Sequence, residues 1–195
     1  MSDDWQSVTF QSGGQLRQGR PFDWDSEWQT LQNYSLALSV IPTNTTTTYR
    51  WGGLQLTGTY GFNVYKVLAS DLARSTYVNI KAPANSTNVI RVVGTTVQMH
   101  AMGITLQGPS EAKILWQFPT ATSVDLEAIE LRGSLLAPYA DVYFDNGNMR
   151  GSIWSWSMTG NAELYWTPYS GTFDCAKYEA VRARQIAART WPYAF

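Results

Sequence analysis

Four carboxylates in the second half of the sequence are the side chains best suited to chemistry. Asp125 and Glu127 alternate within one predicted strand, and Asp141 and Asp145 lie at the ends of another. Glycosidases place two carboxyl groups on either side of the scissile bond, one of them acting as an acid. We therefore keep a carbohydrate-active enzyme as an alternative. Glu127 and Glu130 would fall on opposite faces of an extended strand, which weakens them as a catalytic pair.

The other common catalytic groups are scarce. The chain contains one histidine, His100, and one cysteine, Cys175, which argues against a histidine-based triad, a thiolate zinc site and an internal disulfide. We expect His100 to be a structural histidine with a satisfied partner and Cys175 to be a packed free thiol. The sequence thus predicts no catalytic residues, no metal and no cofactor, and we expect that the protein is not an enzyme.

Charge and hydropathy exclude two further classes of partner. Fourteen basic and 15 acidic residues give a net charge of −1, without the basic excess that nucleic-acid binding requires. The apolar runs are too short to cross a membrane, so we expect no transmembrane segment. Residues 1–5 do not resemble a signal peptide, because they contain neither a basic stretch nor an apolar one.

Aromatic residues are the most plausible ligand contacts. The sequence has nine tryptophans, and Trp154 and Trp156 alternate on the predicted strand 152–158, so both should project from one face. Sugar rings stack on exposed indoles, and we predict that these two residues bind a ligand. The alternative is that both rings pack under a helix or against another subunit.

Two predicted helices flank a β-rich region. Asp23 or Asp25 can cap a helix over residues 23–40, in which Trp24, Trp28 and Leu31 recur at helical spacing and should dock on a sheet. Residues 44–48 are predicted to be an exposed loop. Domain organisation is expected to be a polar N-terminal arm over 1–22, a β domain over 23–173, and a C-terminal segment over 174–195, which contains a helix up to about residue 189 and an aromatic tail.

The β region is roughly periodic. Similar strand-like segments begin at Asn63, Asn88 and Lys113, and a fourth begins 28 residues later at Asp141. Units of about 25 residues that contain several short strands are typical of a solenoid, in which each coil lies on the previous one. We therefore predict a mainly β protein, a β-solenoid or β-helix with one long helix packed along it, and keep a β-sandwich as the alternative.

Several motifs, in order along the chain, resemble the choice-of-anchor A domain. They are KILWQFPTAT at 113–122, LRGSLLAPYADV at 131–142, NGNMRGSI at 146–153 and TGNAE at 159–163. The resemblance implies a right-handed β-solenoid that belongs to a secreted or surface-displayed adhesin, and it supplies no catalytic residues. The chain departs from that family in its short arm before the helix and in Ser155, where alanine is common.

We predict a non-catalytic extracellular or cell-surface module of adhesin or structural type, secreted or displayed, with a glycan or a matrix component as ligand. The first alternative is a carbohydrate-binding or carbohydrate-active solenoid. The second is an ice-binding-like surface, suggested by the threonine pairs at 57–59 and 120–122. The remaining solenoid units lack such pairs, which argues against ice binding.

Self-association is the last expectation from the sequence. An open solenoid end exposes unpaired main-chain groups that invite another strand, and the tail places Trp191, Tyr193 and Phe195 together. We predict that these three aromatic residues contact a neighbouring copy and that the protein forms a homo-oligomer or filament. The alternative is a monomer whose tail folds back over its own solenoid.

Overall fold

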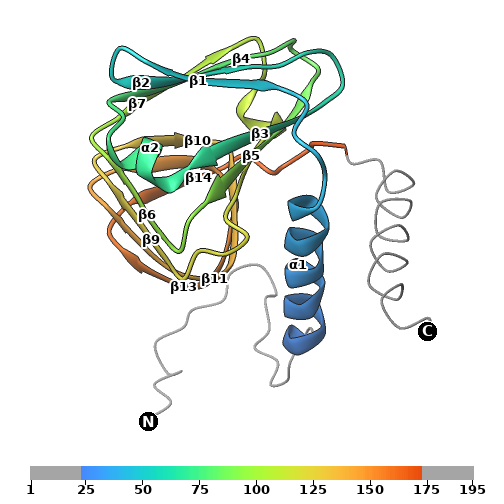
Figure 1. Ribbon diagram of the computed structural model, residues 1–195. Helices are drawn as coiled ribbons and strands as arrows, with labels where there is room; N and C mark the ends of the chain where they lie inside the picture. The colour runs from blue at the N-terminus through green and yellow to red at the C-terminus, as the bar shows by residue number, and fades with distance from the viewer. Residues whose placement is uncertain (1–22, 173–195) are drawn as a thin grey trace, which may run out of the picture.

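Short strands and two α-helices make up residues 23–172, the part of the chain described by the computed structural model (Figure 1). The helices are α1 (Trp24–Ser39) and α2 (Ala69–Ala73), and Glu111–Lys113 forms one turn of 3₁₀-helix. The strands are β1 (Thr46–Arg50), β2 (Gly53–Thr57), β3 (Phe62–Leu68), β4 (Tyr77–Lys81), β5 (Thr87–Val93), β6 (Thr96–His100), β7 (Gly103–Gln107), β8 (Ile114–Gln117), β9 (Ser123–Glu127), β10 (Glu130–Arg132), β11 (Ser134–Asp145), β12 (Asn148–Gly151), β13 (Ile153–Gly160) and β14 (Glu163–Trp166).

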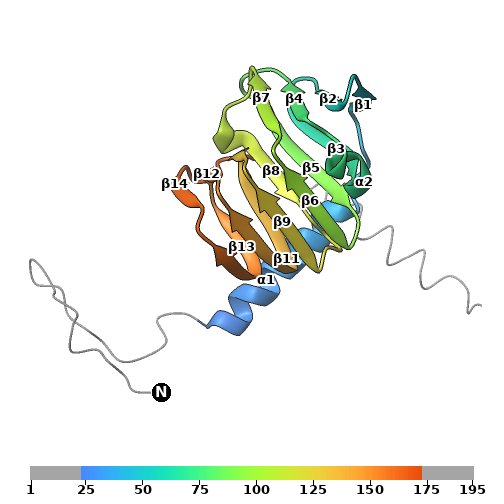
Figure 2. The ribbon, with the colours of Figure 1, turned by 90° about the vertical axis from the view of Figure 1, so that its left-hand side faces the viewer.

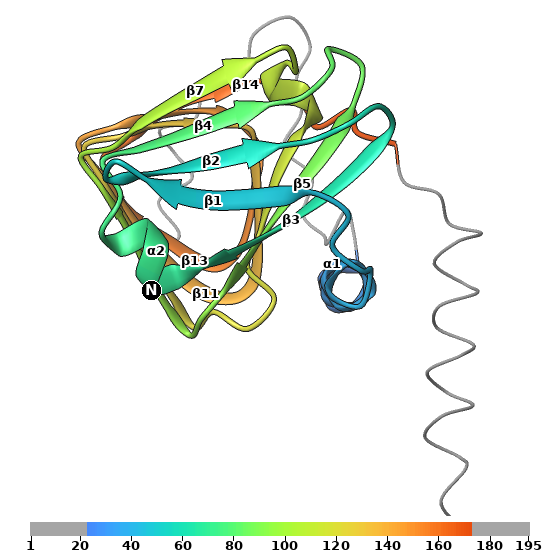
Figure 3. The ribbon, with the colours of Figure 1, turned by 45° about the horizontal axis from the view of Figure 1, so that its top comes forward.

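Successive coils stack through parallel strands. The chain passes in turn through a sheet ordered β1-β2-β4-β7, a sheet ordered β3-β5-β8-β11-β9-β6, and a sheet ordered β10-β12-β14. Strand β13 pairs with β11, and β1–β2 is the only antiparallel pair among these ladders. Figure 3 shows β1, β2, β4 and β7 lying side by side. Parallel pairing between coils fits the predicted β-helix-like fold and does not fit a sandwich of antiparallel strands. The right-handed turn stays a prediction.

Strands β3, β5 and β8, with the first halves of β11 and β13, form a sheet that carries apolar side chains on both sides; we call it the helix-covered sheet. One row of its side chains points into the coil, where it joins the core: Tyr65, Ile90, Trp116, Leu135 and Ile153. The opposite side carries Val64, Val89, Leu115 and Leu136, which form a second apolar cluster with Leu38 of α1. Helix α1 therefore shields apolar surface that would otherwise face water, as the predicted docking helix should.

Polar side chains of the helix-covered sheet hold the C-terminal half of α1. Arg91 donates to the main-chain oxygens of Leu38 and Ile41, the latter at 2.7 Å, and Gln117 donates to that of Ser35. A guanidinium suits this position because the last carbonyls of a helix lack partners within the helix and carry partial negative charge. Burial lowers the pKa of Arg91. At the other end, the Asp23 side chain accepts from the main-chain N–H of Ser26, as expected of a cap.

A buried polar network fixes the register of the first two coils. Asn63 donates to the side-chain oxygen of Asn88 at 3.1 Å, and the Tyr65 hydroxyl donates to the same oxygen at 3.1 Å. Asn88 in turn donates to the main-chain oxygen of Ser86 at 2.9 Å. Because unsatisfied polar groups are costly in a core, a shift of either strand would break several bonds at once.

Two glycines make the tight corners of the later coils. Gly160 has φ +126°, and a Cβ there would lie 1.9 Å from the main-chain oxygen of Phe144. Gly133 has φ +108°, and its Cβ would overlap Ile114. Both positions combine a positive φ with close packing that leaves no room for a side chain, and only glycine meets both requirements without strain.

Two expectations about the strands were wrong. The segment at Asp141 is not the repeat that follows the segment at Lys113. Strand β8 pairs instead with Ser134–Leu136, and Asp141 pairs with Ser123, because the coils become shorter after β9 and lose their long turns. Residues 46–48 are not loop but part of β1, where antiparallel pairing with β2 satisfies their main chain.

The coil is open at β14 within the described residues. All four residues of β14 are exposed, including Leu164 and Trp166, and β14 pairs with β12 only. The expected arm over 1–22 and the helix and tail over 174–195 lie outside the described residues. Within 23–172, neither α-helix is long and apolar enough to cross a membrane.

Replacing Arg91 tests the anchoring of α1. Arg91→Met keeps most of the side-chain volume but removes both donors to the helix C-terminus, and we expect the free energy of unfolding to fall by about 1.5–3 kcal/mol. The control Arg74→Met breaks an exposed ion pair with Asp71 and should cost less than about 1 kcal/mol. Urea denaturation measures both. Equal losses in the two variants would contradict this role of Arg91.

Candidate functional site

One outward face of the coil gathers the four carboxylates singled out in the sequence. This acidic face comprises the outward residues of β6, β9 and the second halves of β11 and β13, four strands that lie side by side in Figure 2. Asp125 and Glu127 come from β9, and Asp141 and Asp145 come from the adjacent β11. In register, Glu127 lies opposite Asp145. The structure thus places all four carboxylates on one face of the coil.

Hydrogen bonds and ion pairs engage two of these carboxylates. The Ser157 hydroxyl donates to Asp141 at 2.5 Å, and the Nε2 of His100 lies 3.0 Å from an oxygen of Asp125. His100 therefore has the satisfied partner that the sequence analysis expected. Among the described residues, no group of three or more His, Cys, Asp or Glu is arranged to hold a metal ion. Cys175 lies outside the described residues.

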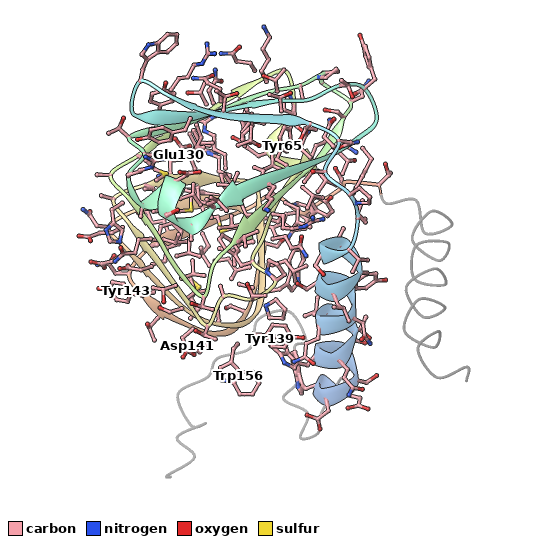
Figure 4. The ribbon with its side chains drawn as sticks, in the orientation of Figure 1. Tyr65, Glu130, Tyr139, Asp141, Tyr143 and Trp156 are labelled. Carbon is pink, nitrogen blue, oxygen red and sulfur yellow. The ribbon has the colours of Figure 1, made fainter. Side chains whose placement is uncertain are left out.

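Exposed aromatic rings accompany the carboxylates on β11 and β13. Tyr139 is 45% exposed, Tyr143 46% and Trp156 67%. In register, Tyr143 lies opposite Asp125 and is followed by Asp145 two residues along the same face. Figure 4 shows Tyr139, Asp141 and Trp156 on the side of the coil where β11 and β13 run. The result is a ridge of rings with carboxylate acceptors beside it.

The electrostatics of the acidic face act most clearly on Tyr143. The negative charge of Asp145 is the main cause that raises the pKa of Tyr143, and partial burial and the charges of Glu127 and Asp125 raise it further. The outward residues of these four strands include no lysine or arginine that would offset the charge. Tyr143 stays neutral and keeps its hydroxyl proton over a wider pH range than an ordinary tyrosine.

Trp154 and Trp156 do not share one environment. The register between β11 and β13 shifts between Ala137 and Asp141, which breaks the regular alternation of side chains. Trp154 lies opposite Leu136 and packs in the cluster under α1, whereas Trp156 is exposed and meets Trp28 edge-on at 5.7 Å between ring centroids. Packing under a helix, the alternative considered for both rings, describes Trp154, whereas Trp156 contacts α1 at Trp28 and remains 67% exposed.

The sequence analysis missed Tyr139 and Tyr143. The signal for Tyr143 was present, because Asp141, Tyr143 and Asp145 alternate with the buried Val142 and Phe144. The same alternation extends back to Tyr139, which is exposed and precedes the buried Ala140, so a signal for Tyr139 was present as well.

A second exposed face, which we call the arginine–glutamate face, carries opposite charges that neutralise each other. On β10 and β12, Glu130 lies 3.1 Å from Arg132 and 3.2 Å from Arg150. Burial alone would raise the pKa of Glu130, but the hydrogen bonds and charges of the two arginines outweigh it and lower that pKa. These groups satisfy one another and leave little free charge for a ligand.

The third exposed face is largely uncharged. We call the outward residues of β1, β2, β4 and β7 the amide face. Its central row consists of Thr48, Gln55, Asn79 and Thr105 in register. Asn79 donates to the Gln55 side-chain oxygen at 3.0 Å, and Gln55 donates to the Tyr77 hydroxyl at 3.2 Å.

Comparison with known families identifies the chain. A family described as "Putative Ice-binding-like adhesive domain" matches residues 2–166. The chain belongs to this family. The match supports the adhesive character that the motifs implied, whereas membership of the choice-of-anchor A family stays a prediction.

Comparison with individual proteins adds one solved structure. The crystal structure of an ice-binding protein from the Antarctic ascomycete Antarctomyces psychrotrophicus is 17% identical, with a TM-score of 0.46, and the match covers 77% of this chain and 72% of that one. Among curated proteins, no sequence matches.

The raised pKa of Tyr143 can be measured directly. Asp145→Asn removes the largest cause, so the pKa of Tyr143 should fall toward its ordinary value of about 10. Titration of ¹³Cζ-labelled tyrosine by NMR, with the signal assigned through Tyr143→Phe, reports it. The control Asp71→Asn should leave this pKa unchanged. A Tyr143 pKa that does not respond to Asp145→Asn would contradict the electrostatics described here.

Proposed function

We propose that this protein is a non-catalytic extracellular adhesive module that binds polyhydroxylated polymers, such as cell-wall or matrix glycans, through the acidic face. The observation that carries the proposal is the ridge of Tyr139, Tyr143 and Trp156 beside four outward carboxylates. The adhesive family to which the chain belongs supports a surface role, and secretion or display at the cell surface is part of this proposal.

The chemistry of the acidic face suits sugars. Aromatic faces provide flat apolar area for the C–H side of a pyranose ring, and carboxylates accept hydrogen bonds from its hydroxyl groups. Strands hold these groups in fixed register, so little conformational entropy is lost when a polymer binds. A polymer with repeating units can contact several rings along β11 and β13 at once, which adds up individually weak contacts.

Binding fits this face better than bond cleavage does. A glycosidase needs one carboxyl group held protonated as an acid and a second across the scissile bond. Here the Ser157 hydroxyl donates to Asp141 and the Nε2 of His100 lies 3.0 Å from Asp125, so neighbouring side chains already engage two of the four carboxylates. All four carboxylates stand on outward strand faces. We therefore assign them to hydrogen-bond acceptance, with no cofactor.

Removal of exposed rings from the acidic face tests the proposal. Tyr143→Ala combined with Trp156→Ala should weaken binding to an insoluble polysaccharide at least tenfold, because each lost stacking contact costs about 1 kcal/mol or more. Pull-down on cellulose, chitin, β-1,3-glucan and mannan first finds the polymer that is retained, and depletion isotherms then give Kd.

The matched control removes equally exposed rings elsewhere. Tyr60 and Trp51 are 88% and 85% exposed and lie outside the acidic face, so the combination Tyr60→Ala with Trp51→Ala should bind as the unchanged protein does. Binding that survives loss of Tyr143 and Trp156, or release of reducing ends from any polymer, would contradict the proposal.

Ice binding is a second candidate, favoured by the family description and by the amide face. Ice planes are recognised by flat, uncharged, regularly spaced side chains, and Thr48, Gln55, Asn79 and Thr105 form such a row. Arg50 and Lys81 in the adjacent rows disturb it. The adhesive proposal predicts no thermal hysteresis. Hysteresis that disappears in Thr105→Lys would instead assign ice binding to the amide face.

A further inference from the structure

An apolar pocket of about 290 Å³ lies between α1 and the helix-covered sheet. Its wall includes α1 residues on one side and strand residues on the other: Leu31, Tyr34, Leu38, Phe62, Leu115, Leu136, Trp154 and Tyr169. The polar groups among these side chains are the hydroxyls of Tyr34 and Tyr169 and the indole N–H of Trp154. The other lining side chains are entirely apolar. A cavity of about 150 Å³ lined by such residues accommodates benzene, so this pocket has room for a larger aromatic ring.

The last described residues lie beside the pocket, since Tyr169 is part of its wall. The main-chain N–H of Ser170 donates to the main-chain oxygen of Ala112 at 2.8 Å, and that of Thr172 donates to the Thr87 hydroxyl at 3.0 Å. Lys113 also donates to the main-chain oxygen of Ser170, at 2.6 Å. These bonds fix the segment that contributes Tyr169 to the pocket wall. Residues 173–195 therefore begin beside the pocket.

The residues that follow supply aromatic rings. Trp191, Tyr193 and Phe195 alternate with Pro192 and Ala194, and the family match ends at residue 166, so the family domain does not include them. An extended segment with this alternation presents the three rings on one side. Their size and lack of charge match the pocket wall.

Chain length decides which copy of the pocket these rings can reach. The sequence predicts a helix from Asp174 to about Arg189, and 16 residues at 1.5 Å each span about 24 Å. Such a helix carries Trp191 about 24 Å away from the point at which the chain leaves its own pocket. A helix of that length would put the rings out of reach of their own pocket and within reach of a neighbouring molecule.

We propose that Trp191, with Tyr193 and Phe195 beside it, occupies the pocket of a second copy of this chain. Reciprocal exchange gives a closed dimer, and head-to-tail exchange gives a filament. The pocket continues into a second groove at the open end of the coil, since Leu31 and Trp154 line both. That continuity provides apolar surface for the second and third rings. The proposal does not depend on glycan binding, because the acidic face contributes none of the lining residues.

Light scattering on the full chain and on a variant that stops at Thr190 makes the first test. We expect the full chain to associate at 100 µM and the shortened variant to be monomeric. Leu31→Trp fills the pocket and should also give a monomer. Its control, Leu36→Trp, adds the same ring to an α1 residue that is 62% exposed and does not line the pocket, and it should associate as the full chain does.

A synthetic peptide of residues 189–195 tests the contact in trans. Isothermal titration should show that it binds the variant that stops at Thr190, and that Leu31→Trp in that variant weakens binding at least tenfold while Leu36→Trp does not. Association that persists without residues 191–195 would overturn the proposal, and so would a monomeric full chain. If that monomer also melts at a lower temperature after truncation, the rings occupy their own pocket. Loss of glycan binding in the Tyr143 and Trp156 variants leaves all of these readouts unchanged.

Discussion

Helix α1 and the helix-covered sheet depend on each other. The sheet is apolar on both sides, because Tyr65 and Trp116 face the core while Val89 and Leu115 face outward. Such a sheet is stable only when both sides are shielded from water. Arg91 and Gln117 fix where the helix lies on the sheet, because they donate to the main-chain oxygens of Ser35 and Leu38 in α1 and of Ile41 just after it. The helix and the coil thus form one packed unit.

This constraint determines which surfaces remain for contact with other molecules. With one side covered, the acidic face, the arginine–glutamate face and the amide face stay exposed. The arginine–glutamate face neutralises itself through Glu130, Arg132 and Arg150. The acidic face keeps its charge and adds aromatic rings, which makes it the best candidate for adhesion. Where α1 and the sheet do not meet fully, the apolar pocket remains.

Local sequence patterns predicted much of the fold. Asp23 as a cap and the 25-residue spacing from Asn63 to Asn88 are short-range signals, and the structure confirms both. The predicted stripe on α1 is confirmed at Leu31, which packs against the sheet, but not at Trp24, which is 58% exposed. The shortening of later coils was not predictable, because it depends on turns that disappear after β9. The different exposure of Trp154 and Trp156 also escaped prediction, because it depends on how far α1 covers β13: Trp154 lies in the cluster under α1, whereas Trp156 stays exposed beside Trp28. The carboxylates were found from their residue type, but Tyr139 was not.

Native-state hydrogen exchange tests most directly whether α1 and the helix-covered sheet form one cooperative unit. If they do, the last-turn amides of α1 and the amides of β5 and β8 should exchange with the same free energy, equal to that of global unfolding. Arg91→Met should lower all of these values together. Exchange of the α1 amides at a much lower free energy, while β5 and β8 stay protected, would contradict the account, because the sheet would then be stable without its helix.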